Sequence, residues 1–226
     1  MIAIQCKEIK KSFCAGESKV EALKGIDLQI FEKKLTLLVG PSGSGKTTLL
    51  SIIETILTPD EGDLFILGHH VNKMNELEKA RFRNQNLGIV FQTLHLIPTL
   101  TVLENVTLPL IIKGEEKSSA EKKGISLLKQ LHISKKMNFP HTELSRGEQQ
   151  RAAIARALIN DPPIILCDEP TSALDQENGI TFMTLLHELA LSKGRTVFVI
   201  THDHRIFSFA DHIIHINDGL IEKKNV

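Results

Sequence analysis

The segment Gly40-Pro-Ser-Gly-Ser-Gly-Lys-Thr47 is the strongest indication of the fold of this chain. It fits the phosphate-loop pattern G-x-x-x-x-G-K-T, and it stands between an apolar run typical of a buried strand and a segment with helical periodicity. The glycines allow backbone N–H groups to converge on a phosphate, and the following helix adds the positive end of its dipole. A glycine-rich turn with a chance lysine is the alternative, and the flanking sequence disfavours it. We predict a phosphate-binding site formed by Gly40, Pro41, Ser42, Gly43, Ser44, Gly45, Lys46, Thr47 and Thr48.

A pair of acids ends a second apolar run, IILCDE, from Ile164 to Glu169. Four apolar residues predict a buried strand, with Cys167 as a small apolar filler. At the end of that strand, Asp168 can hold magnesium through water, as phosphoryl-transfer sites require. Glu169 is then free to act as general base on an attacking water. The alternative is a pair of helix-capping acids after a core strand.

The two motifs together indicate a nucleoside triphosphatase. In it, Lys46 supplies a charge for the β- and γ-phosphates, and the Thr47 hydroxyl can ligate magnesium. A GTPase would carry the base-reading pattern Asn-Lys-x-Asp. The nearest stretch, Asn72 to Asn75, lacks the aspartate, which weakens the GTPase and kinase interpretations.

Strand and helix periodicities alternate at both ends of the 226-residue chain, which predicts an α/β fold with a parallel sheet covered on both faces. A helical block interrupts this pattern. We expect one domain over residues 1–226, with a core from residues 1–92 and 161–226 and a helical part from residues 93–160. Strands are predicted at 3–10, 25–31, 34–40, 63–68, 88–92, 163–170, 195–203 and 212–218, and helices after the phosphate loop and at 76–83, 101–112, 119–131, 146–159, 176–192 and 204–210.

The composition excludes several classes of protein. Lys plus Arg and Asp plus Glu both number 27, so the formal net charge is zero and the basic footprint of a nucleic-acid binder is absent. Three cysteines are too few for a disulfide framework and suit a reducing cytosol. The most apolar long segment, Leu94 to Ile112, is interrupted by polar and proline residues and falls short of a membrane span. We therefore expect no nucleic-acid partner, and any membrane role through a partner protein.

Further motifs, in the same order, make the chain similar to the ATP-binding-cassette (ABC) ATPases over essentially its whole length. Gln92 after GIVF resembles the Q-loop, and LSRGEQQR from Leu144 resembles the signature motif LSGGQ. SALD, residues 172–175, resembles the D-loop, and His202 resembles the switch histidine. The resemblance implies a P-loop NTPase core of the RecA type, with an N-terminal antiparallel β-subdomain and an inserted α-helical subdomain. Residues 81–111 further resemble the lipoprotein-releasing and macrolide-exporting branch.

The resemblance implies an ATP-binding subunit that drives a separate membrane permease from the cytoplasmic face of the cell membrane, with ATP and Mg2+ as cofactors. It also implies a head-to-tail homodimer, in which each ATP lies between the phosphate loop of one subunit and the signature motif of the other. The implied catalytic residues are Lys46, Glu169 and His202, and the implied metal site is formed by Thr47, Gln92 and Asp168. The other residues implied to contact the nucleotide are Ser145, Arg146, Gly147 and Glu148. Asp175 is implied to lie at the nucleotide as well and to couple the two sites.

Several of these expectations leave alternatives open. Adenine usually stacks on a tyrosine in this family, but the chain has no Tyr or Trp, so Phe13 is the candidate. The alternative is a strand-end Phe13 packed in the core. Leu94 to Ile112 is either the strip that contacts the permease or simply the core of the helical part. Other metal binding is not expected, because His212 and His215 would face opposite sides of a strand, and His69-His70 is expected in a solvated loop.

Arg146 departs from the family pattern, which has glycine there. If the position requires a positive φ, a non-glycine residue costs about 1–2 kcal/mol. If it is already helical, the cost is small and the guanidinium adds a cation near a triphosphate. Ser145 is expected to cap the following helix, and Glu148 suits its first turn. We expect the motif to work, because the catalytic set in the same chain is complete.

Two other functions compete with transport. In the first, the subunit would transmit force to a membrane protein that moves no substrate, as in cell-division relatives. Only the identity of the partner separates this function from transport. A DNA-repair or chromosome-structure ATPase would need a long insertion between the phosphate loop and the signature. Only about a hundred residues separate Lys46 from Ser145, which disfavours that function.

Overall fold

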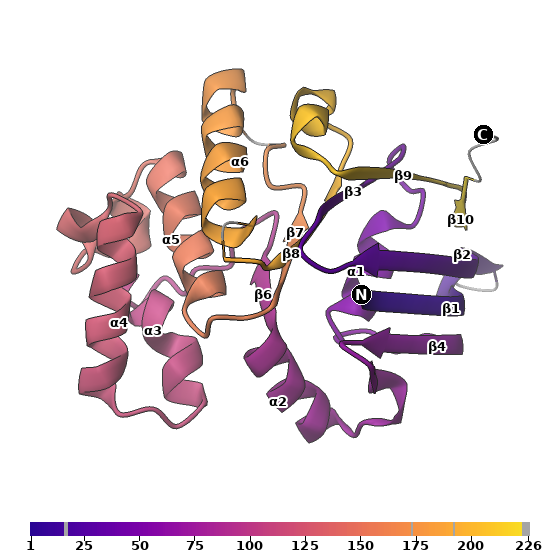
Figure 1. Ribbon diagram of the computed structural model, residues 1–226, viewed down its shortest axis with the longest axis horizontal. Coiled ribbons are helices and arrows are strands. Elements are labelled where there is room, and N and C mark those ends of the chain that lie inside the picture. Colours follow the sequence, from indigo (N-terminus) through magenta and orange to yellow (C-terminus); the bar gives the residue numbers. More distant parts are fainter. Residues whose placement is uncertain (16–17, 173, 192, 223–226) are drawn as a thin grey trace.

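The computed structural model describes residues 1–15, 18–172, 174–191 and 193–222. A six-stranded sheet lies between a group of helices and a second, antiparallel sheet (Figure 1). Its strand order is β10-β9-β3-β8-β7-β6, and all neighbours are parallel except the edge pair β9 and β10. The strands are β3 (Leu35–Val39), β6 (Leu87–Val90), β7 (Ile164–Asp168), β8 (Thr196–Thr201), β9 (His212–Asn217) and β10 (Leu220–Ile221).

The antiparallel sheet has the order β2-β1-β4-β5, formed by β1 (Ile2–Ala15), β2 (Ser18–Phe31), β4 (Glu61–Ile66) and β5 (His69–His70). Its first two strands are longer than predicted. Their pairing shifts register at four points, and such bulges break the period-two pattern that marks a strand in sequence. The predicted loop at His69-His70 is wrong, because both residues pair with β4. His69 is exposed, as predicted, whereas His70 is half-buried and its Nε2 lies 2.7 Å from Oδ1 of Asp63.

The α-helices are α1 (Lys46–Ile53), α2 (Glu76–Asn86), α3 (Val102–Ile112), α4 (Lys117–Gln130), α5 (Arg146–Leu158) and α6 (Gln176–Leu191). Short 3-10 turns are η1 (Val71–Lys73), η2 (Ser134–Lys136), η3 (His141–Glu143) and η4 (His204–Phe209). We call α3, α4 and α5 the helical lobe; they pack together at the left of Figure 1. The helical block begins at Val102 rather than at Thr93, because Thr101 caps α3 and the preceding Leu94 and His95 adopt positive φ.

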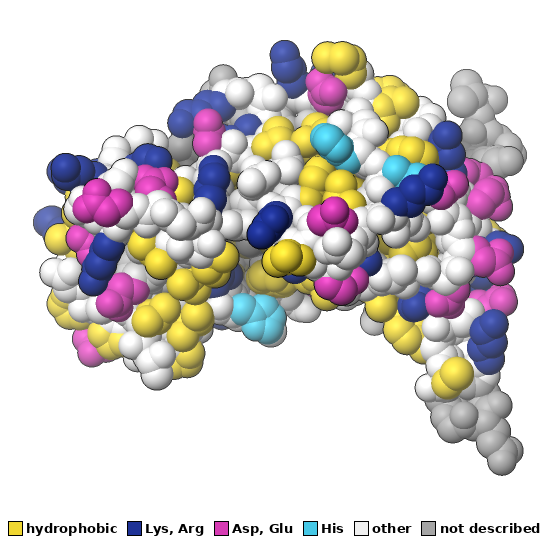
Figure 2. Space-filling model, turned by 90° about the horizontal axis from the view of Figure 1, so that it is seen from below, with side chains coloured by type: hydrophobic (Ala, Val, Ile, Leu, Met, Phe, Trp, Pro, Cys, Tyr) yellow, Lys and Arg dark blue, Asp and Glu magenta, His cyan; other side chains and the backbone are white. Residues whose placement is uncertain are grey.

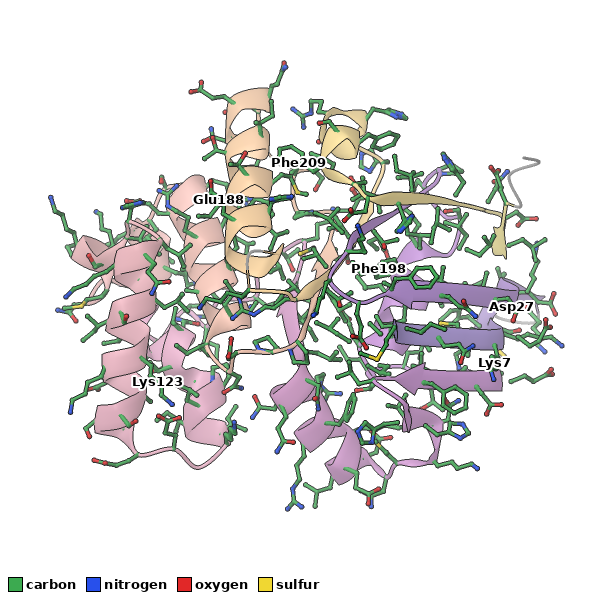
Figure 3. All side chains as sticks on the ribbon, viewed as in Figure 1. Lys7, Asp27, Lys123, Glu188, Phe198 and Phe209 are labelled. Carbon is green, nitrogen blue, oxygen red and sulfur yellow. The ribbon has the colours of Figure 1, made fainter. Side chains whose placement is uncertain are left out.

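Both faces of the six-stranded sheet are covered, as predicted. In β3, the side chains of Leu35, Leu37 and Val39 join a core shared with the helical lobe and α6, whereas Leu38 joins a core shared with α1 and the antiparallel sheet. Phe198 of β8 is fully buried in this second core, and Figure 3 shows it pointing toward the antiparallel sheet. The carboxyl ends of the parallel strands are thereby left to carry the functional loops.

Two predicted segments are only partly described, since Ala173 of the D-loop and Ser192 at the end of α6 lie outside the described residues. Within the described part of the chain, every helix is too short or too polar to cross a bilayer.

Candidate functional site

The phosphate loop connects β3 to α1, as the sequence predicts. Two of its glycines stand where no side chain fits. A Cβ on Gly40 would lie 2.1 Å from the Ile216 carbonyl oxygen, and one on Gly45 would lie 2.6 Å from that of Ala22. Gly45 also has a φ of 99°, a conformation that favours glycine. The loop is therefore held against β9 and β2, with its open side toward solvent.

Lys46 is the first residue of α1 and is 7% exposed. Its Nζ donates to the carbonyl oxygens of Gly40 and Pro41, each at 2.8 Å. Burial lowers the pKa of Lys46, while the charges of Glu169 and Asp168 act in the opposite direction. These bonds hold the ammonium over its own loop, where the phosphates of a nucleotide would lie.

Asp168 ends β7, and one oxygen of its carboxylate lacks a partner among the described protein groups. Its Oδ1 is buried and has no hydrogen-bond partner among the described residues. Burial raises the pKa of Asp168, the neighbouring charge of Glu169 adds to the rise, and Lys46 opposes it. An orphaned carboxylate oxygen of this kind suits a divalent cation or a water bound to one. The residues present thus fit magnesium.

Glu169 and His202 follow neighbouring parallel strands and meet at the same edge of the sheet. Nδ1 of His202 lies 2.8 Å from Oε1 of Glu169, and the backbone N–H of His202 donates to Oε2 of Glu169 at 3.4 Å. The Glu169 side chain is largely buried, and that of His202 is 64% exposed. Glu169 also adopts a φ of 45°, an uncommon conformation for a residue other than glycine. The alternative reading of the acids as helix caps is wrong for Glu169, which faces this histidine.

A cavity of about 560 Å³ opens over the phosphate loop. It brings ten of the predicted site residues together, but Gly40, Ser44 and Asp168 do not line it. Its lining residues are Ala22, Pro41, Ser42, Gly43, Gly45, Lys46, Thr47, Thr48, Gln92, Glu169 and His202. The site thus has a phosphate cradle, a lysine, a hydroxyl, an amide and an acid–histidine pair in reach of one ligand.

Three residues that support the site were not predicted from the sequence: Thr171, Asp203 and Arg205. Asp203 accepts a hydrogen bond from the Thr171 hydroxyl at 2.7 Å and is bonded by the Arg205 guanidinium. Arg205 is the main cause that lowers the pKa of Asp203 to about 2. This network ties the turn after Glu169 to the turn after His202. The sequence Thr-His-Asp after a predicted strand could have suggested a role for Asp203. Only the fold, however, brings the Thr171 hydroxyl within hydrogen-bonding distance of Asp203.

The signature region begins α5, where Ser145 and Glu148 form a capping box. Glu148 N–H donates to the Ser145 hydroxyl at 3.3 Å, and Glu148 Oε2 accepts from the Ser145 N–H at 2.8 Å. Arg146 is the first helical residue and has no positive φ, so the costly alternative for this position is wrong. Gly147 has no close neighbour that a Cβ would meet below 3.8 Å.

Not every predicted residue lies at the cavity. Ser145, Gly147 and Glu148 do not line it, and Arg146 reaches it only through a 3.4 Å hydrogen bond to the Gln92 carbonyl. Asp175 binds Asn178 at the start of α6. Phe13 pairs with Val20 across the β1–β2 hairpin and is 44% exposed, so its alternative as a core residue is wrong.

The comparisons with known proteins agree on one family. The ABC transporter family model matches residues 23–172 of the chain. An uncharacterized ABC transporter ATP-binding protein of Methanocaldococcus jannaschii is 43% identical over 225 residues, which cover 98% of this chain and 96% of that protein. The lipoprotein-releasing system ATP-binding protein LolD of Porphyromonas gingivalis is 40% identical over 218 residues, covering 96% and 98%.

The fold is also found among solved structures. A dimeric post-hydrolysis state of the same M. jannaschii cassette, bound to ADP and Pi, has a TM-score of 0.90 and 41% identity, and the match covers 97% of each chain.

In the part of this chain that the structure describes, no group of three or more His, Cys, Asp or Glu side chains is arranged to hold a metal ion.

Proposed function

This chain belongs to the ABC transporter family of ATP-hydrolysing, ATP-binding subunits, and on that premise we propose that it works as a head-to-tail homodimer that drives a membrane permease of the lipoprotein-releasing or macrolide-exporting type. The observation that carries the proposal is the cavity in which the phosphate loop faces Gln92, Glu169 and His202. Its relatives include lipoprotein-releasing ATPases and a cassette solved as a dimer. The subunit would lie at the cytoplasmic face of the cell membrane, attached through the permease.

The phosphate loop would hold the β- and γ-phosphates through its backbone N–H groups and the Lys46 ammonium. Thr47, Gln92 and Asp168 would hold Mg2+. When bound, this ion neutralises charge on the phosphates. Phe13, exposed on the hairpin, would stack on adenine.

Glu169 would take the proton of the attacking water. Its Oε1 faces the His202 ring at 2.8 Å, which leaves Oε2, with only a long contact, as the oxygen more open to that proton. His202 would thus fix the orientation of the carboxylate, and its exposed edge would meet the γ-phosphate. The Asp203 network would hold the histidine in this position.

The signature residues Ser145, Arg146, Gly147 and Glu148 would complete the nucleotide site of the partner subunit. The N-terminus of α5 supplies N–H groups, and Ser145 is an exposed residue at that end. Asp175, held by Asn178 near the same surface, would couple the two sites.

We further propose that the permease docks in a second cavity, of about 410 Å³, between α2, β6, α3 and α5. Arg83 and Arg156 line it, but they are bonded to Thr55 and to the backbone of residues 94–95, respectively. Two apolar side chains of its lining, Ile56 and Ile112, are 56% and 69% exposed. An amphipathic helix of the permease suits such a groove.

The segment from Leu94 to Ile112 contributes Pro109 and Ile112 to the lining of this groove. Leu94, Leu96, Val102, Val106 and Leu110 are buried in the lobe core, whereas Ile97, Ile111 and Ile112 are exposed. The buried residues fit the alternative of a lobe core, and we propose the exposed ones as the contact with the permease. On the face shown in Figure 2, hydrophobic side chains gather over the helical side of the molecule.

The dimer is tested by Glu169→Gln and light scattering with and without ATP. We expect a monomer without nucleotide and a dimer with ATP, because removal of the base traps ATP. Lys46→Ala in the same background is the control and should stay monomeric. A Glu169→Gln chain that binds ATP yet stays monomeric would contradict the head-to-tail dimer. For the branch, a co-purifying permease with few membrane spans and a large extracytoplasmic domain is the expected partner.

A further inference from the structure

A third cavity, of about 280 Å³, opens between the helical lobe and α6. Helices α5 and α6 lie side by side there, and α4 packs against α5 (Figure 1). The lining residues are Leu131, His132, Gly147, Gln150, Arg151, Asn178, Thr181, Phe182 and Leu185. Among the described residues, none lines both this cavity and the nucleotide cavity. The third cavity is therefore available to a ligand of its own.

Three apolar side chains form much of the wall. Leu131 is fully buried, Phe182 is 4% exposed, and Leu185 is half-buried against the same core. Gly147 has no side chain to fill the space, and a Cβ added to it would meet its nearest neighbour only at 3.8 Å. Such a wall favours the apolar body of a small molecule.

Arg151 brings a positive charge without a counter-ion to this cavity. Its Nε is buried and has no hydrogen-bond partner among the described residues. The acid on which Arg151 acts, Glu148, is bonded instead to the N–H and the hydroxyl of Ser145. The described lining contains no acidic side chain. A buried donor of a cation that lacks a partner costs free energy, and a bound anion would remove that cost.

The polar neighbours of the guanidinium already have partners of their own. The Gln150 amide donates to the Pro170 carbonyl oxygen at 3.0 Å, and the Asn178 amide donates to Asp175 at 2.7 Å. Nη1 of Arg151 would lie 3.8 Å from a Cβ on Gly147, which places the guanidinium at the open space beside this glycine. Arg151 thus supplies the charged N–H donors that a ligand would use.

We propose that this cavity binds a small amphiphilic carboxylate, whose oxygens accept hydrogen bonds from Arg151 and whose apolar body packs against Leu131, Phe182 and Leu185. A guanidinium presents parallel N–H donors that match the two oxygens of a carboxylate. A cavity of ~150 Å³ takes benzene, so this larger one suits a chain of about eight carbons. The ligand would bridge α5 of the lobe and α6 of the core, and it should stabilise the folded chain.

The test titrates octanoate into the full, nucleotide-free chain at neutral pH and follows binding by calorimetry. One octanoate per chain should bind, with a dissociation constant of about 1 mM or lower. Octan-1-ol, which lacks the charge, and acetate, which lacks the apolar body, should each bind at least about tenfold more weakly. Octanoate should also raise the melting temperature of the chain.

Variants locate the bound octanoate. Arg151→Gln should weaken its binding about tenfold or more, and Arg151→Lys should weaken it less, because the charge is kept. Thr181→Trp, at an exposed position of the lining, should weaken binding by filling the cavity without disturbing the core. Lys46→Ala, which alters the nucleotide cavity, and Arg81→Gln, on the exposed face of α2, should bind octanoate as the parent does.

Octanoate that binds the parent no more tightly than octan-1-ol, or with a dissociation constant above about 1 mM, would contradict this site. Equal binding by the parent and Thr181→Trp, or loss of binding in Lys46→Ala, would place the ligand elsewhere and be equally contrary. If Arg151→Gln does not fold, the comparison of octanoate with octan-1-ol and the Thr181→Trp variant decide. All of these measurements omit ATP, so the proposed dimer and its nucleotide site stand or fall separately.

Discussion

The ring Nδ1 of His202 lies 2.8 Å from Oε1 of Glu169, although the two residues are 33 positions apart. Each directly follows a strand, Glu169 after β7 and His202 after β8, and these strands are parallel neighbours in which Asp168 pairs with Ile200. The pair is therefore set by the register of the sheet rather than by a flexible loop. Such an arrangement fixes a carboxylate before substrate binds, as an oriented general base requires.

Replacing Glu169 by Gln should lower the rate of ATP hydrolysis by about 10²–10⁴-fold, the range that a positioned general base supplies. The amide keeps the shape of the side chain, so the affinity for ATP should stay within a few-fold of the parent. Phosphate release and a nucleotide titration measure the two quantities. A Glu169→Gln chain that still hydrolyses ATP within tenfold of the parent would assign the base to another group.

Removing the lysine of the phosphate loop should act on binding instead. Lys46→Ala removes a buried ammonium that lies over the cavity, so the affinity for ATP should fall about ten- to a hundredfold. The thermal stabilisation that ATP gives the parent should fall with it. Melting curves with and without ATP measure this, with the exposed Lys122→Ala of α4 as the control. Equal stabilisation of Lys46→Ala and the parent would place the phosphates elsewhere.

The parts of the site that are local in sequence were predictable. The phosphate loop needs only its own glycines, Lys46 and the adjoining strand and helix. The cap of α5 follows from Ser145 and Glu148, three residues apart, and the structure shows this capping box. The apolar run before Asp168 predicted a buried strand, and β7 ends at that residue.

The parts that depend on distant pairing were not predictable. The bond from Thr171 to Asp203 joins two turns that only the sheet brings together. The turn at Leu94 and His95 is stabilised by Arg156, about sixty residues away, while its apolar residues read as helix. The strand at His69-His70 exists because β4 offers an edge for pairing. In the first two cases the deciding partner lies outside the window in which periodicity is read, whereas β5 pairs with residues three to five positions away and is too short to show a periodicity.

A buried carboxyl should make the stability of the chain depend on pH. Glu54, at the end of α1, is 3% exposed, and its Oε1 has no partner among the described residues. Burial raises the pKa of Glu54 from 4.5 to about 7, the charge of Asp168 adds to the rise, and Arg83 opposes it. Because the folded chain then holds a proton that the unfolded chain has lost, the free energy of unfolding should fall as pH rises from 4.5 to 7.

The size of this effect is about 3 kcal/mol over that pH window, and little further change should follow above pH 7. Glu54→Gln should remove it, leaving the two chains similar at pH 4.5 and the variant several degrees more stable at pH 8. Asp168, whose pKa is also raised, contributes a remaining slope of the same sign. Thermal melting from pH 4.5 to 8 measures this, with the exposed Glu21→Gln as the control. A Glu54→Gln variant whose stability follows that of the parent at every pH would show that Glu54 is ionised in the fold.

The proposed permease groove makes a prediction that separates docking from catalysis. Ile112 is 69% exposed at the groove rim, so Ile112→Glu should leave folding and ATP-driven dimerisation unchanged. Burying a carboxylate without a partner against an apolar helix costs free energy, so the variant should no longer bind the permease. Co-purification with the permease in detergent measures this loss. Leu220→Glu, at a comparably exposed apolar position on β10, should bind as the parent does. If Ile112→Glu also co-purifies in full, the groove between α2 and α3 is not the docking site, while the nucleotide site stands unaffected.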